Sequence, residues 1–284
     1  MVFRSGNDSD WRICANTWTN EMEHISSASN NLIKHIIRLE KKRERFAQKQ
    51  IVVEGIREII KLSKSGIQPI AMVLNEHWQG EELQNFTDQV AAQRVVTASD
   101  DVFRKICYRE GVANAVAICP MPSTSLEHLQ VPGNPLIIIL EALEKPGNIG
   151  AIFRSADAAG ADAVILANPL TDAFNPNIIR ASLGTLFSVP FAEADNESVH
   201  AWLRKHSFQI ISTYLEANQS PYGENLDRPT AIVMGTEATG ISDFWINHSD
   251  ALVKILMHGE ADSMNVSTSA AVMLYEAVRQ RLDS

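Results

Sequence analysis

Two patterns of hydrophobic and polar positions alternate along this chain. Short, uninterrupted apolar runs such as 136–140 are typical of strands in a parallel sheet that is covered on both faces. Longer stretches such as 266–282 place apolar residues, including Ala270, Leu274 and Ala277, at helical spacing. Because strand-like and helix-like stretches follow each other in turn, the pattern predicts an α/β fold.

The first part of the chain predicts a small α/β domain over residues 26–119. A helical stretch covers 26–50. Residues 1–25 before it show no periodicity, so we expect them to form a flexible extension. Further elements follow at short intervals: strands at 51–55, 69–74, 94–96 and 115–118, and helices at 56–64, 81–93 and 99–110.

Proline and glycine are concentrated at 120–133, and this composition predicts a linker to a second domain over 134–284. That domain opens with a strand at 136–140, a loop and helix at 145–159, and a strand at 163–167, which together make a βαβ unit. The later elements are a loop running into a helix at 175–184, a helix at 197–205, strands at 209–212, 231–234 and 251–257, and a helix at 266–282.

Polar and glycine residues follow the ends of the last predicted strands. The strand 231–234 ends at Gly235, and the strand 251–257 is followed by a loop in which Ser263 and Asn265 precede the final helix. Strand ends and helix starts meet at one edge of an open α/β sheet, which is where such folds bind ligands. We therefore expect a ligand site at this edge.

Composition narrows the class of protein. The chain has 284 residues, of which 45% are hydrophobic, and can bury a substantial core. No apolar run approaches the roughly 18 to 20 residues that span a bilayer, and the start has no apolar signal-peptide region, so we expect a cytoplasmic protein. The cysteines Cys14, Cys107 and Cys119 lack paired ligand spacing, so the sequence predicts neither disulfides nor a metal site.

A basic concentration lies in the first predicted helix. Between Lys34 and Lys49, only Glu40 and Glu44 oppose the basic residues, which include Lys41, Lys42, Arg43 and Arg45. The formal net charge of −9 argues mildly against a nucleic-acid partner, but the distribution of charge matters more than its sum. Two interpretations stay open: a solvated helix face with i,i+4 ion pairs, or a patch that contacts RNA.

Familiar catalytic motifs are missing from the sequence. The loop 146–150 has neither the G-x-G-x-x-G spacing of a dinucleotide site nor the G-x-x-x-x-G-K-[ST] spacing of a phosphate loop. No nucleophile elbow and no histidine pair at metal spacing occur. What remains are polar residues near strand ends, each of which alone could be a helix cap, a surface ion pair or a loop residue. They are Asn148, Arg154, Arg180, Ser182, Glu237, Ser263 and Asn265.

Together these residues form ordered motifs that resemble a known family. The motifs are Asn148 with Gly150 and Arg154; Asn175-Pro176 with Arg180-Ala181-Ser182 and Gly184; Gly235-x-Glu237 with Gly240; and Ser263-Met264-Asn265-Val266-Ser267 with Leu274-Tyr275-Glu276. Over about 134–282 they resemble the SpoU ribose 2'-O-methyltransferases of the SPOUT class, which use AdoMet. Residues 31–75 resemble the small RNA-binding substrate domain of many relatives. Met264 stands where leucine is usual and Leu256 where proline is common, and neither change removes a polar group.

The resemblance implies a parallel sheet whose C-terminal part threads through a loop as a trefoil knot, which pattern alone would exclude. It also implies AdoMet as cofactor, ribosomal more than transfer RNA as substrate, and a homodimer with cofactor sites near its interface. No metal is expected. The catalytic residues implied are Arg154, Asn148, Glu237, Ser263 and Asn265. Those implied for the cofactor are Met234, Gly235, Glu237, Gly240, Ile255, Met257, Ser263, Met264 and Asn265. The RNA-binding residues expected are Lys41, Lys42, Arg43, Arg45, Arg154, Arg180 and Ser182.

The resemblance makes Arg154 the key catalytic residue. Methyl transfer to a ribose hydroxyl needs alignment and help with the loss of the hydroxyl proton. A guanidinium is a poor base because it stays protonated, so Arg154 acts either as an unusual deprotonated base or as a cation that holds a neighbouring phosphate and stabilises the developing alkoxide. Asn148 would orient it, and Glu237 would order the site or take the proton.

Two other classes of function stay open. A nicotinamide-dependent oxidoreductase would need the glycine fingerprint that is missing. A non-catalytic RNA-binding protein of the same fold would have lost Asn148, Arg154 or Asn265, and all three are present.

Overall fold

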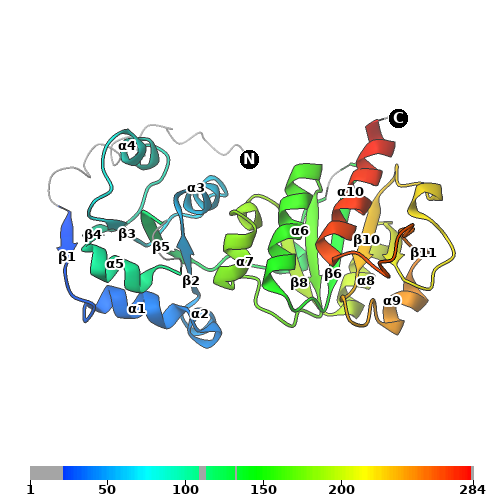
Figure 1. Ribbon diagram of the computed structural model, residues 1–284, viewed down its shortest axis with the longest axis horizontal. Coiled ribbons are helices and arrows are strands. Elements are labelled where there is room, and N and C mark those ends of the chain that lie inside the picture. The colour runs from blue at the N-terminus through cyan, green and yellow to red at the C-terminus, as the bar shows by residue number, and fades with distance from the viewer. Residues whose placement is uncertain (1–21, 109–112, 132, 283–284) are drawn as a thin grey trace, which may run out of the picture. The chain divides into compact units, whose positions relative to one another are not determined.

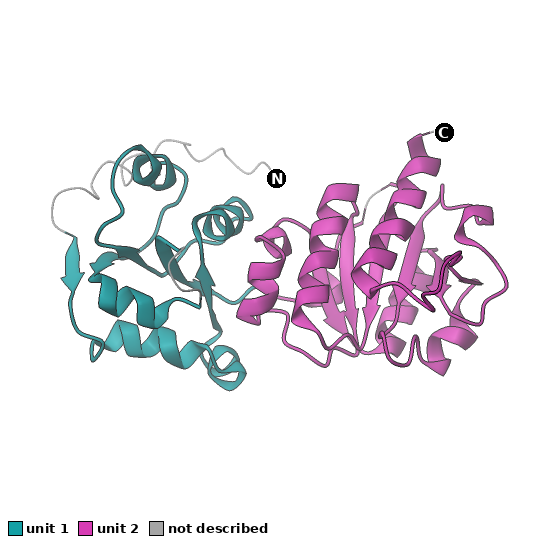
Figure 2. Cartoon of the chain, in the orientation of Figure 1, with its two compact units in different colours: residues 1–122 teal, residues 123–284 magenta. Residues whose placement is uncertain are grey.

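Residues 22–108, 113–131 and 133–282 are described by the computed structural model of this chain. They divide into two units, Met1–Pro122 and Ser123–Ser284, which Figure 2 colours separately. The boundary falls within the segment 120–133 that the composition marks as a linker. Most of the predicted extension lies outside the described residues, as do positions 109–110 of a predicted helix and Pro132 of the predicted linker.

The N-terminal unit is built on a five-stranded sheet in the order β1-β4-β3-β5-β2 (Figure 1). β1, β4 and β3 run parallel, whereas β5 is antiparallel to both β3 and β2. The strands are β1 (Glu23–Ile25), β2 (Gln50–Glu54), β3 (Ala71–Asn75), β4 (Val95–Ala98) and β5 (Ala115–Pro120). The helices are α1 (Asn31–Leu39), α2 (Lys42–Gln48), α3 (Ile56–Lys64), α4 (Glu81–Thr87) and α5 (Asp100–Ile106).

Two predicted boundaries at the start of this unit are wrong. The flexible extension does not reach residue 25, because Glu23–Ile25 pairs with β4 and buries Ile25. The helix predicted over 26–50 is two helices. Buried Arg45 donates from Nη1 to the carbonyl oxygens of Leu39 (2.8 Å) and Glu40 (2.6 Å), where α1 ends. Carbonyls at a helix end have no partner within the helix, so this side chain supports the break.

The C-terminal unit contains a six-stranded sheet in the order β11-β9-β10-β6-β7-β8, with every pairing parallel. The strands are β6 (Leu136–Glu141), β7 (Ala163–Ala167), β8 (Phe191–Ala194), β9 (Gln209–Thr213), β10 (Thr230–Met234) and β11 (Ala251–Val253). The helices are α6 (Pro146–Ala159), α7 (Pro176–Ala181), α8 (Asn196–Lys205), α9 (Asp243–His248) and α10 (Val266–Leu282), with 3-10 turns at Leu126–His128, Thr185–Phe187 and Pro221–Gly223. The predicted α/β fold with a parallel sheet is confirmed.

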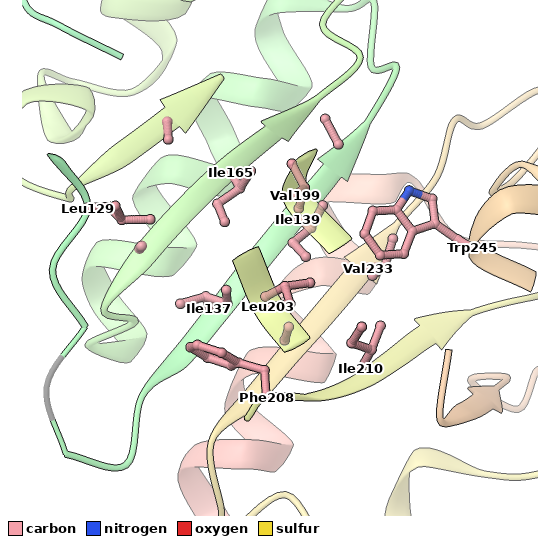
Figure 3. Close-up of a cluster of buried hydrophobic side chains, with 14 of the residues drawn as sticks. Leu129, Ile137, Ile139, Ile165, Val199, Leu203, Phe208, Ile210, Val233 and Trp245 are labelled. Atoms are coloured by element: carbon pink, nitrogen blue, oxygen red, sulfur yellow. The ribbon is translucent and has the colours of Figure 1, made fainter. Parts of the chain in front are cut away.

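Strand β6 lies in the middle of the sheet and is buried along its whole length. Ile137 and Ile139 join a core cluster with Val199 and Leu203 of α8 and Trp245 of α9 (Figure 3). Alternate residues of a strand point to opposite faces, and α10 packs with α6, β6 and β10. The continuous apolar run at 136–140 therefore reflects cover on both faces. Among the described residues, no helix is both long and apolar enough to cross a membrane.

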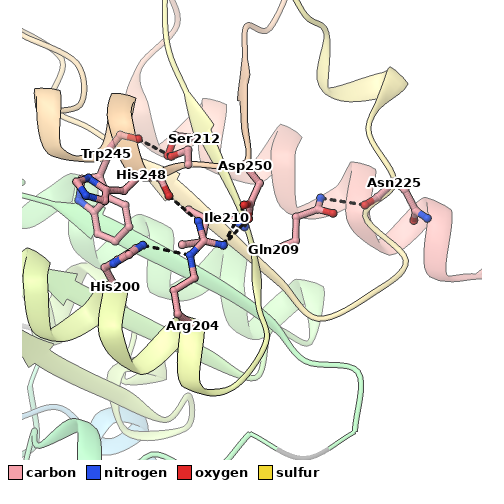
Figure 4. A network of polar contacts seen from close by, with 10 residues as sticks. His200, Arg204, Gln209, Ile210, Ser212, Asn225, Trp245, His248 and Asp250 are labelled. Carbon is pink, nitrogen blue, oxygen red and sulfur yellow. Dashed lines mark hydrogen bonds and ion pairs between the residues drawn. The ribbon is translucent and has the colours of Figure 1, made fainter.

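An ion pair fastens the edge of the sheet where β11 begins. Arg204 of α8 donates from Nη1 to both carboxylate oxygens of Asp250 (2.9 and 2.8 Å), and from Nη2 to the carbonyl oxygen of His248 (2.8 Å; Figure 4). Asp250 also accepts the backbone N–H of Ile210 in β9 (2.8 Å). One guanidinium thus joins α8, the end of α9 and the start of β11.

Strand β11 ends at Val253, although the apolar pattern predicts a strand over 251–257. β11 is an edge strand that pairs with β9, and Val253 also forms an isolated parallel bridge with Gln219, where the N–H of Lys254 donates to the carbonyl of Gln219 (2.8 Å). Residues 254–265 form no helix or strand. The threading of this C-terminal segment into a knot stays a prediction.

Candidate cofactor and catalytic site

A tight loop follows β10 at the carboxyl edge of the sheet. Thr236 and Gly240 exchange backbone hydrogen bonds (2.9 and 3.0 Å) across it, and Gly240 has a φ of +70°. Gly235 is buried beneath this loop. A Cβ on it would lie 2.1 Å from the carbonyl carbon of Gly240 and 2.3 Å from the nitrogen of Ile241. Only glycine allows the backbone to fold back so closely.

Glu237, at the tip of this loop, is the centre of a polar cluster. Its Oε1 accepts hydrogen bonds from the side-chain amides of Asn148 (2.9 Å) and Asn265 (2.6 Å), and its Oε2 pairs with the ammonium of Lys145. The amide of Asn265 also donates to the side-chain carbonyl of Asn148 (3.2 Å). The fold therefore joins the start of α6, the loop after β10 and the start of α10.

The pKa of Glu237 is held below its ordinary value, chiefly by the hydrogen bond from Lys145 and further by that from Asn148. The backbone N–H of Val266, in the first turn of α10, contributes in the same direction. A helix N-terminus favours negative charge, so the carboxylate suits this position. Glu237 is ionised at neutral pH and can only accept hydrogen bonds.

Asn265 caps α10 as well as contacting the cluster. Its side-chain carbonyl accepts from the N–H (2.9 Å) and the hydroxyl (2.6 Å) of Ser267. Side-chain oxygens at this position satisfy N–H groups that have no partner in the first turn. Every polar atom of the Asn265 side chain is thereby used, and its orientation is fixed.

Arg154 lies on α6, four residues beyond a close contact with α7. A Cβ on Gly150 would lie 2.5 Å from the Cβ of Ala181 and 2.7 Å from the nitrogen of Ser182, so glycine lets the two helices meet. Arg154 itself is exposed and makes no hydrogen bond or ion pair with any residue that the structure describes. Its guanidinium is available to an external group.

Comparison with known proteins shows to which family the chain belongs. The SpoU rRNA Methylase family model matches residues 135–275, and the MRM3-like substrate binding domain model matches residues 30–117. A crystal structure of an RNA 2'-O ribose methyltransferase is 37% identical, with a TM-score of 0.81, over 91% of this chain and 99% of its own. The chain belongs to the SpoU rRNA methylase family. The family that its motifs predict is thereby confirmed.

Two further relatives cover nearly the whole of their own chains. The 23S rRNA (guanosine(2553)-2'-O)-methyltransferase RlmP of Bacillus subtilis is 28% identical over 89% of this chain and 98% of its own. The SpoU methyltransferase AviRb of Streptomyces viridochromogenes, solved in complex with AdoMet, is 26% identical with a TM-score of 0.82, over 90% of this chain and 99% of its own.

The loop before α10 offers this SpoU methylase a place for its cofactor. Among the described residues, the backbone groups of 255–264 make no hydrogen bond to one another or to any other residue. Unpaired backbone N–H and C=O groups require partners, and a nucleoside such as that of AdoMet carries matching polar edges. Ile255, Met257 and Met264 are half-buried in the same loop and can cover an apolar ring face, while Ser263 is exposed. These residues fit AdoMet.

Met234 is placed in keeping with the backbone role expected of it, whereas Ser182 is placed differently from its predicted role. Met234 is buried at the end of β10, and its sulfur accepts from the hydroxyl of Thr213 (3.7 Å), so only its backbone can serve a cofactor. Ser182 is fully buried and its hydroxyl donates to the carbonyl of Ile179 (2.8 Å). The prediction that Ser182 contacts RNA is wrong for this conformation, because α7 and α6 enclose it.

Two more side chains that were predicted to contact RNA form hydrogen bonds within the protein. Buried Arg45 is used at the end of α1, as described above, and the prediction that it contacts RNA is wrong for this reason. Arg180 is half-buried and donates from Nη2 to the side-chain carbonyl of Asn177 (2.8 Å). Sequence position alone does not distinguish a cation directed inward from one directed outward.

One basic and one acidic residue of the site are absent from the sequence prediction. Lys145 pairs with Glu237, and its only signal in the sequence is its place before Pro146 and Asn148. Glu141 closes the apolar run of β6 and is buried. A charge at the end of a buried run is the signal that could have identified it.

Glu141 anchors the far end of the loop that carries Glu237. Its carboxylate accepts the backbone N–H of Ser242 (2.8 Å), the hydroxyl of Ser242 and the side-chain amide of Asn196 (2.7 Å). Asn196 in turn accepts the indole N–H of Trp245 (3.1 Å). All three groups around Glu141 are donors, which is what a buried carboxylate requires. The loop 235–242 is therefore held at both ends.

The described thiols do not form an activated site. Burial raises the pKa of Cys107 to about 12 and also raises that of Cys119, so neither is a thiolate at neutral pH. Among the residues described, no group of three or more His, Cys, Asp or Glu side chains could hold a metal ion. Cys14 lies outside the described residues.

Proposed function

We propose that this SpoU methylase modifies a ribose 2'-hydroxyl of 23S rRNA. It is an AdoMet-dependent RNA 2'-O-methyltransferase by family. Ribosomal rather than transfer RNA is supported by the relatives matched over most of their length, of which RlmP carries 23S rRNA in its name. The observation that carries the proposal is the cluster of Lys145, Asn148, Glu237 and Asn265 on the same unit as the exposed Arg154.

The reaction needs positioning more than covalent chemistry. AdoMet supplies an electrophilic methyl group on its sulfonium. The ribose oxygen would take this methyl group, the sulfur of AdoMet would leave as a neutral thioether, and the hydroxyl proton would pass to solvent water. The protein's task is to hold the two reactants in line and to stabilise charge on the oxygen. The backbone of 234–240 and 255–264 would hold the cofactor, and Arg154 would face the RNA.

Arg154 acts as a cation in this proposal. A guanidinium has five donors and no acceptor, and it stays protonated in proteins, so it cannot take the ribose proton in its usual state. Exposed and without a partner among the described residues, it is free to hold the phosphate next to the reacting ribose and to stabilise the developing alkoxide. Asn148 does not orient it through a direct contact, since the Asn148 amide is directed to Glu237.

Glu237 orders the site in this proposal and does not remove the proton. Its lowered pKa makes it a weaker base than an ordinary carboxylate. The same charge aligns the amides of Asn148 and Asn265, and so fixes where α6 and α10 begin relative to the loop 235–242. The lowered pKa therefore favours the ordering role over the base role, both of which the sequence left open.

The helices α1 and α2 provide the RNA-binding surface in this proposal. Six exposed cations, Lys34, Arg38, Lys41, Lys42, Arg43 and Lys49, form what we call the α1–α2 basic surface. Among the described residues, none of them takes part in an ion pair, and Glu40 and Glu44 pair with none of them. The described residues therefore do not form the i,i+4 ion pairs that would stabilise a charged helix face. Cations without acidic partners among these residues support the interpretation that this surface binds phosphates.

We also propose a homodimer that acts in the cytoplasm, where it meets its rRNA. Tyr275 and Leu282 on α10 and Leu256 in the preceding loop are large, apolar and exposed. Exposed apolar side chains next to a site support an interface there. We propose in addition that the C-terminal part of this unit forms the trefoil knot that the family resemblance implies. Sedimentation at several concentrations tests the dimer.

A methylation assay tests the function. The protein, AdoMet labelled in its methyl group and rRNA from a strain that lacks the gene should give labelled RNA, and mapping of 2'-O-methyl positions should reveal one site missing in that strain. If tRNA became labelled and rRNA did not, the proposal that the substrate is 23S rRNA would be contradicted. AdoMet binding without any methyl transfer would favour the alternative, a non-catalytic RNA-binding protein, although Asn148, Arg154 and Asn265 are all in place.

A further inference from the structure

The helix α2 has its charged and apolar positions reversed relative to an ordinary amphipathic helix. Arg45 is 3% exposed, whereas its neighbour Phe46 is 40% exposed. No other phenylalanine among the described residues is exposed to this degree. An exposed ring forgoes the stabilisation that burial would provide, so the fold does not explain why an aromatic residue stands here.

The ring of Phe46 lies within the α1–α2 basic surface. The ammonium of Lys42, one helical turn earlier, lies 5.7 Å from the ring centroid. Lys41 and Arg43 are at the start of the same short helix, and Lys49 follows it; all are exposed. An aromatic face among exposed cations combines the two features with which proteins bind single-stranded nucleic acid: a stacking surface and charges for the backbone.

We propose that Phe46 stacks on an unpaired RNA base while the neighbouring cations bind the flanking phosphates. The inference rests on the proposed RNA-binding role of the α1–α2 basic surface and adds which part of the RNA this surface contacts. Bases in a duplex are already stacked, so a ring on a convex helix reaches only a base in a loop, a bulge or a single strand. The ammonium of Lys42 then moves from the ring to a phosphate.

Charge favours RNA over a protein partner at this ring. An apolar protein segment would cover Phe46 but would leave the surrounding cations without partners, whereas one strand of RNA supplies both bases and phosphates. Stacking adds affinity whatever the base, because every base has a π face. The surface would thus capture an unpaired segment without reading its sequence.

The test compares two probes and three forms of the full-length protein. Fluorescence anisotropy would measure the affinity for oligouridine and for an abasic oligomer with the same ribose-phosphate backbone, at several salt concentrations. Phe46→Ala should weaken oligouridine binding about tenfold without changing the salt slope, and should leave abasic binding unchanged. Phe46→Tyr keeps a ring and should bind both probes as the parent does.

Other outcomes would overturn the inference. If the parent and Phe46→Ala bind oligouridine with equal affinity, the ring contacts no base, and a protein partner becomes the alternative occupant. Salt-dependent RNA binding and methyl transfer would be unaffected by that result, so the proposed function would not be contradicted. Equal weakening for both probes would indicate a purely structural role for the ring. If the parent binds both probes without salt dependence, the proposed RNA-binding surface fails, and stacking fails with it.

Discussion

The charged groups of the two units are organised in opposite ways. In the C-terminal unit, Lys145, Asn148, Glu237 and Asn265 come from three separate segments and use each other as partners. In the N-terminal unit, the cations of the α1–α2 basic surface come from one continuous stretch, and among the described residues none is paired with an acid.

This difference matches two kinds of ligand. A small cofactor and a reacting hydroxyl need groups that are fixed in advance, because orientation supplies much of the rate enhancement. A polyanion needs charges that are free to replace counterions, and its affinity depends on salt. The two surfaces should therefore respond to mutation, salt and pH in different ways.

The largest effect is expected at Arg154, a cation of the C-terminal unit with no partner among the described residues. Arg154→Ala should lower methyl transfer by about 100-fold to 1,000-fold, because it removes a group that acts on the transition state. AdoMet affinity, measured by calorimetry, should stay as in the parent. Arg154→Lys should also be poor, since an ammonium does not reproduce the planar guanidinium. Equal loss of binding and turnover would show that the role is misassigned.

Gly235→Val should remove most AdoMet affinity and also destabilise the protein. The new side chain would collide with the backbone at Gly240 and Ile241, and such overpacking costs about 1 to 3 kcal/mol. Gly223→Val is the matched control, because a Cβ at Gly223 meets no atom within 4 Å. Calorimetric titration and thermal unfolding measure both effects. Parental affinity in a folded Gly235→Val protein would contradict this placement of the loop.

Neutralising the α1–α2 basic surface should weaken RNA binding and leave AdoMet binding intact. The variant Lys41→Ala, Lys42→Ala, Arg43→Ala should reduce the slope of log K against log salt by about 2, since each phosphate contact on a single strand contributes roughly 0.7. Arg45 is left unchanged because it is buried. The control triple variant, with Arg57, Lys61 and Lys64 of α3 changed to alanine, alters net charge equally. If the two triple variants have the same slope of log K against log salt, the helices α1 and α2 are an ordinary charged surface and do not bind RNA specifically.

Glu141→Gln should weaken the hydrogen bonds that hold the end of the loop 235–242 at Ser242. The carboxylate accepts from Ser242 at both oxygens and from Asn196, so either orientation of an amide opposes a donor. A buried donor without a partner costs about 1 to 3 kcal/mol, and AdoMet affinity should fall several-fold. Asp162→Asn is the control, because Asp162 accepts from the N–H of Leu136 at the other end of β6 (2.7 Å). It should affect unfolding only. Equal affinity in both variants would show that Glu141 has no part in positioning.

The smallest effect is expected for Lys145→Ala, and it depends on pH. Lys145 lowers the pKa of Glu237, so the ordering by the carboxylate is fully present above the ordinary value of 4.5 and is lost as pH falls through the lowered pKa. Without Lys145, the loss of AdoMet affinity on acidification should begin at a higher pH. At neutral pH the change should be small, because an exposed ion pair contributes little. Superimposable pH profiles would mean that this ion pair does not control Glu237.

Local patterns in the sequence predicted most elements. Apolar runs correctly indicated β6, β7 and β10, and helical spacing indicated α10 over its full range 266–282. The family resemblance grouped Asn148, Glu237 and Asn265 in one site; the folded chain places their side chains in hydrogen-bond contact, and their roles stay a prediction. The correctly predicted elements share a cause: strand and helix preferences depend on neighbours close in sequence.

Only the tertiary structure decided what the polar side chains contact. The pair Lys145–Glu237 joins residues 92 positions apart, and Glu141 reaches Ser242 across 101 positions, so no local pattern contains either contact. The inward direction of Arg45 and the outward direction of Phe46 reverse what hydrophobicity predicts, because the open carbonyls at the end of α1 attract the guanidinium. The sequence determined which chemistry is available, and packing between distant segments determined which groups are fixed and which stay exposed.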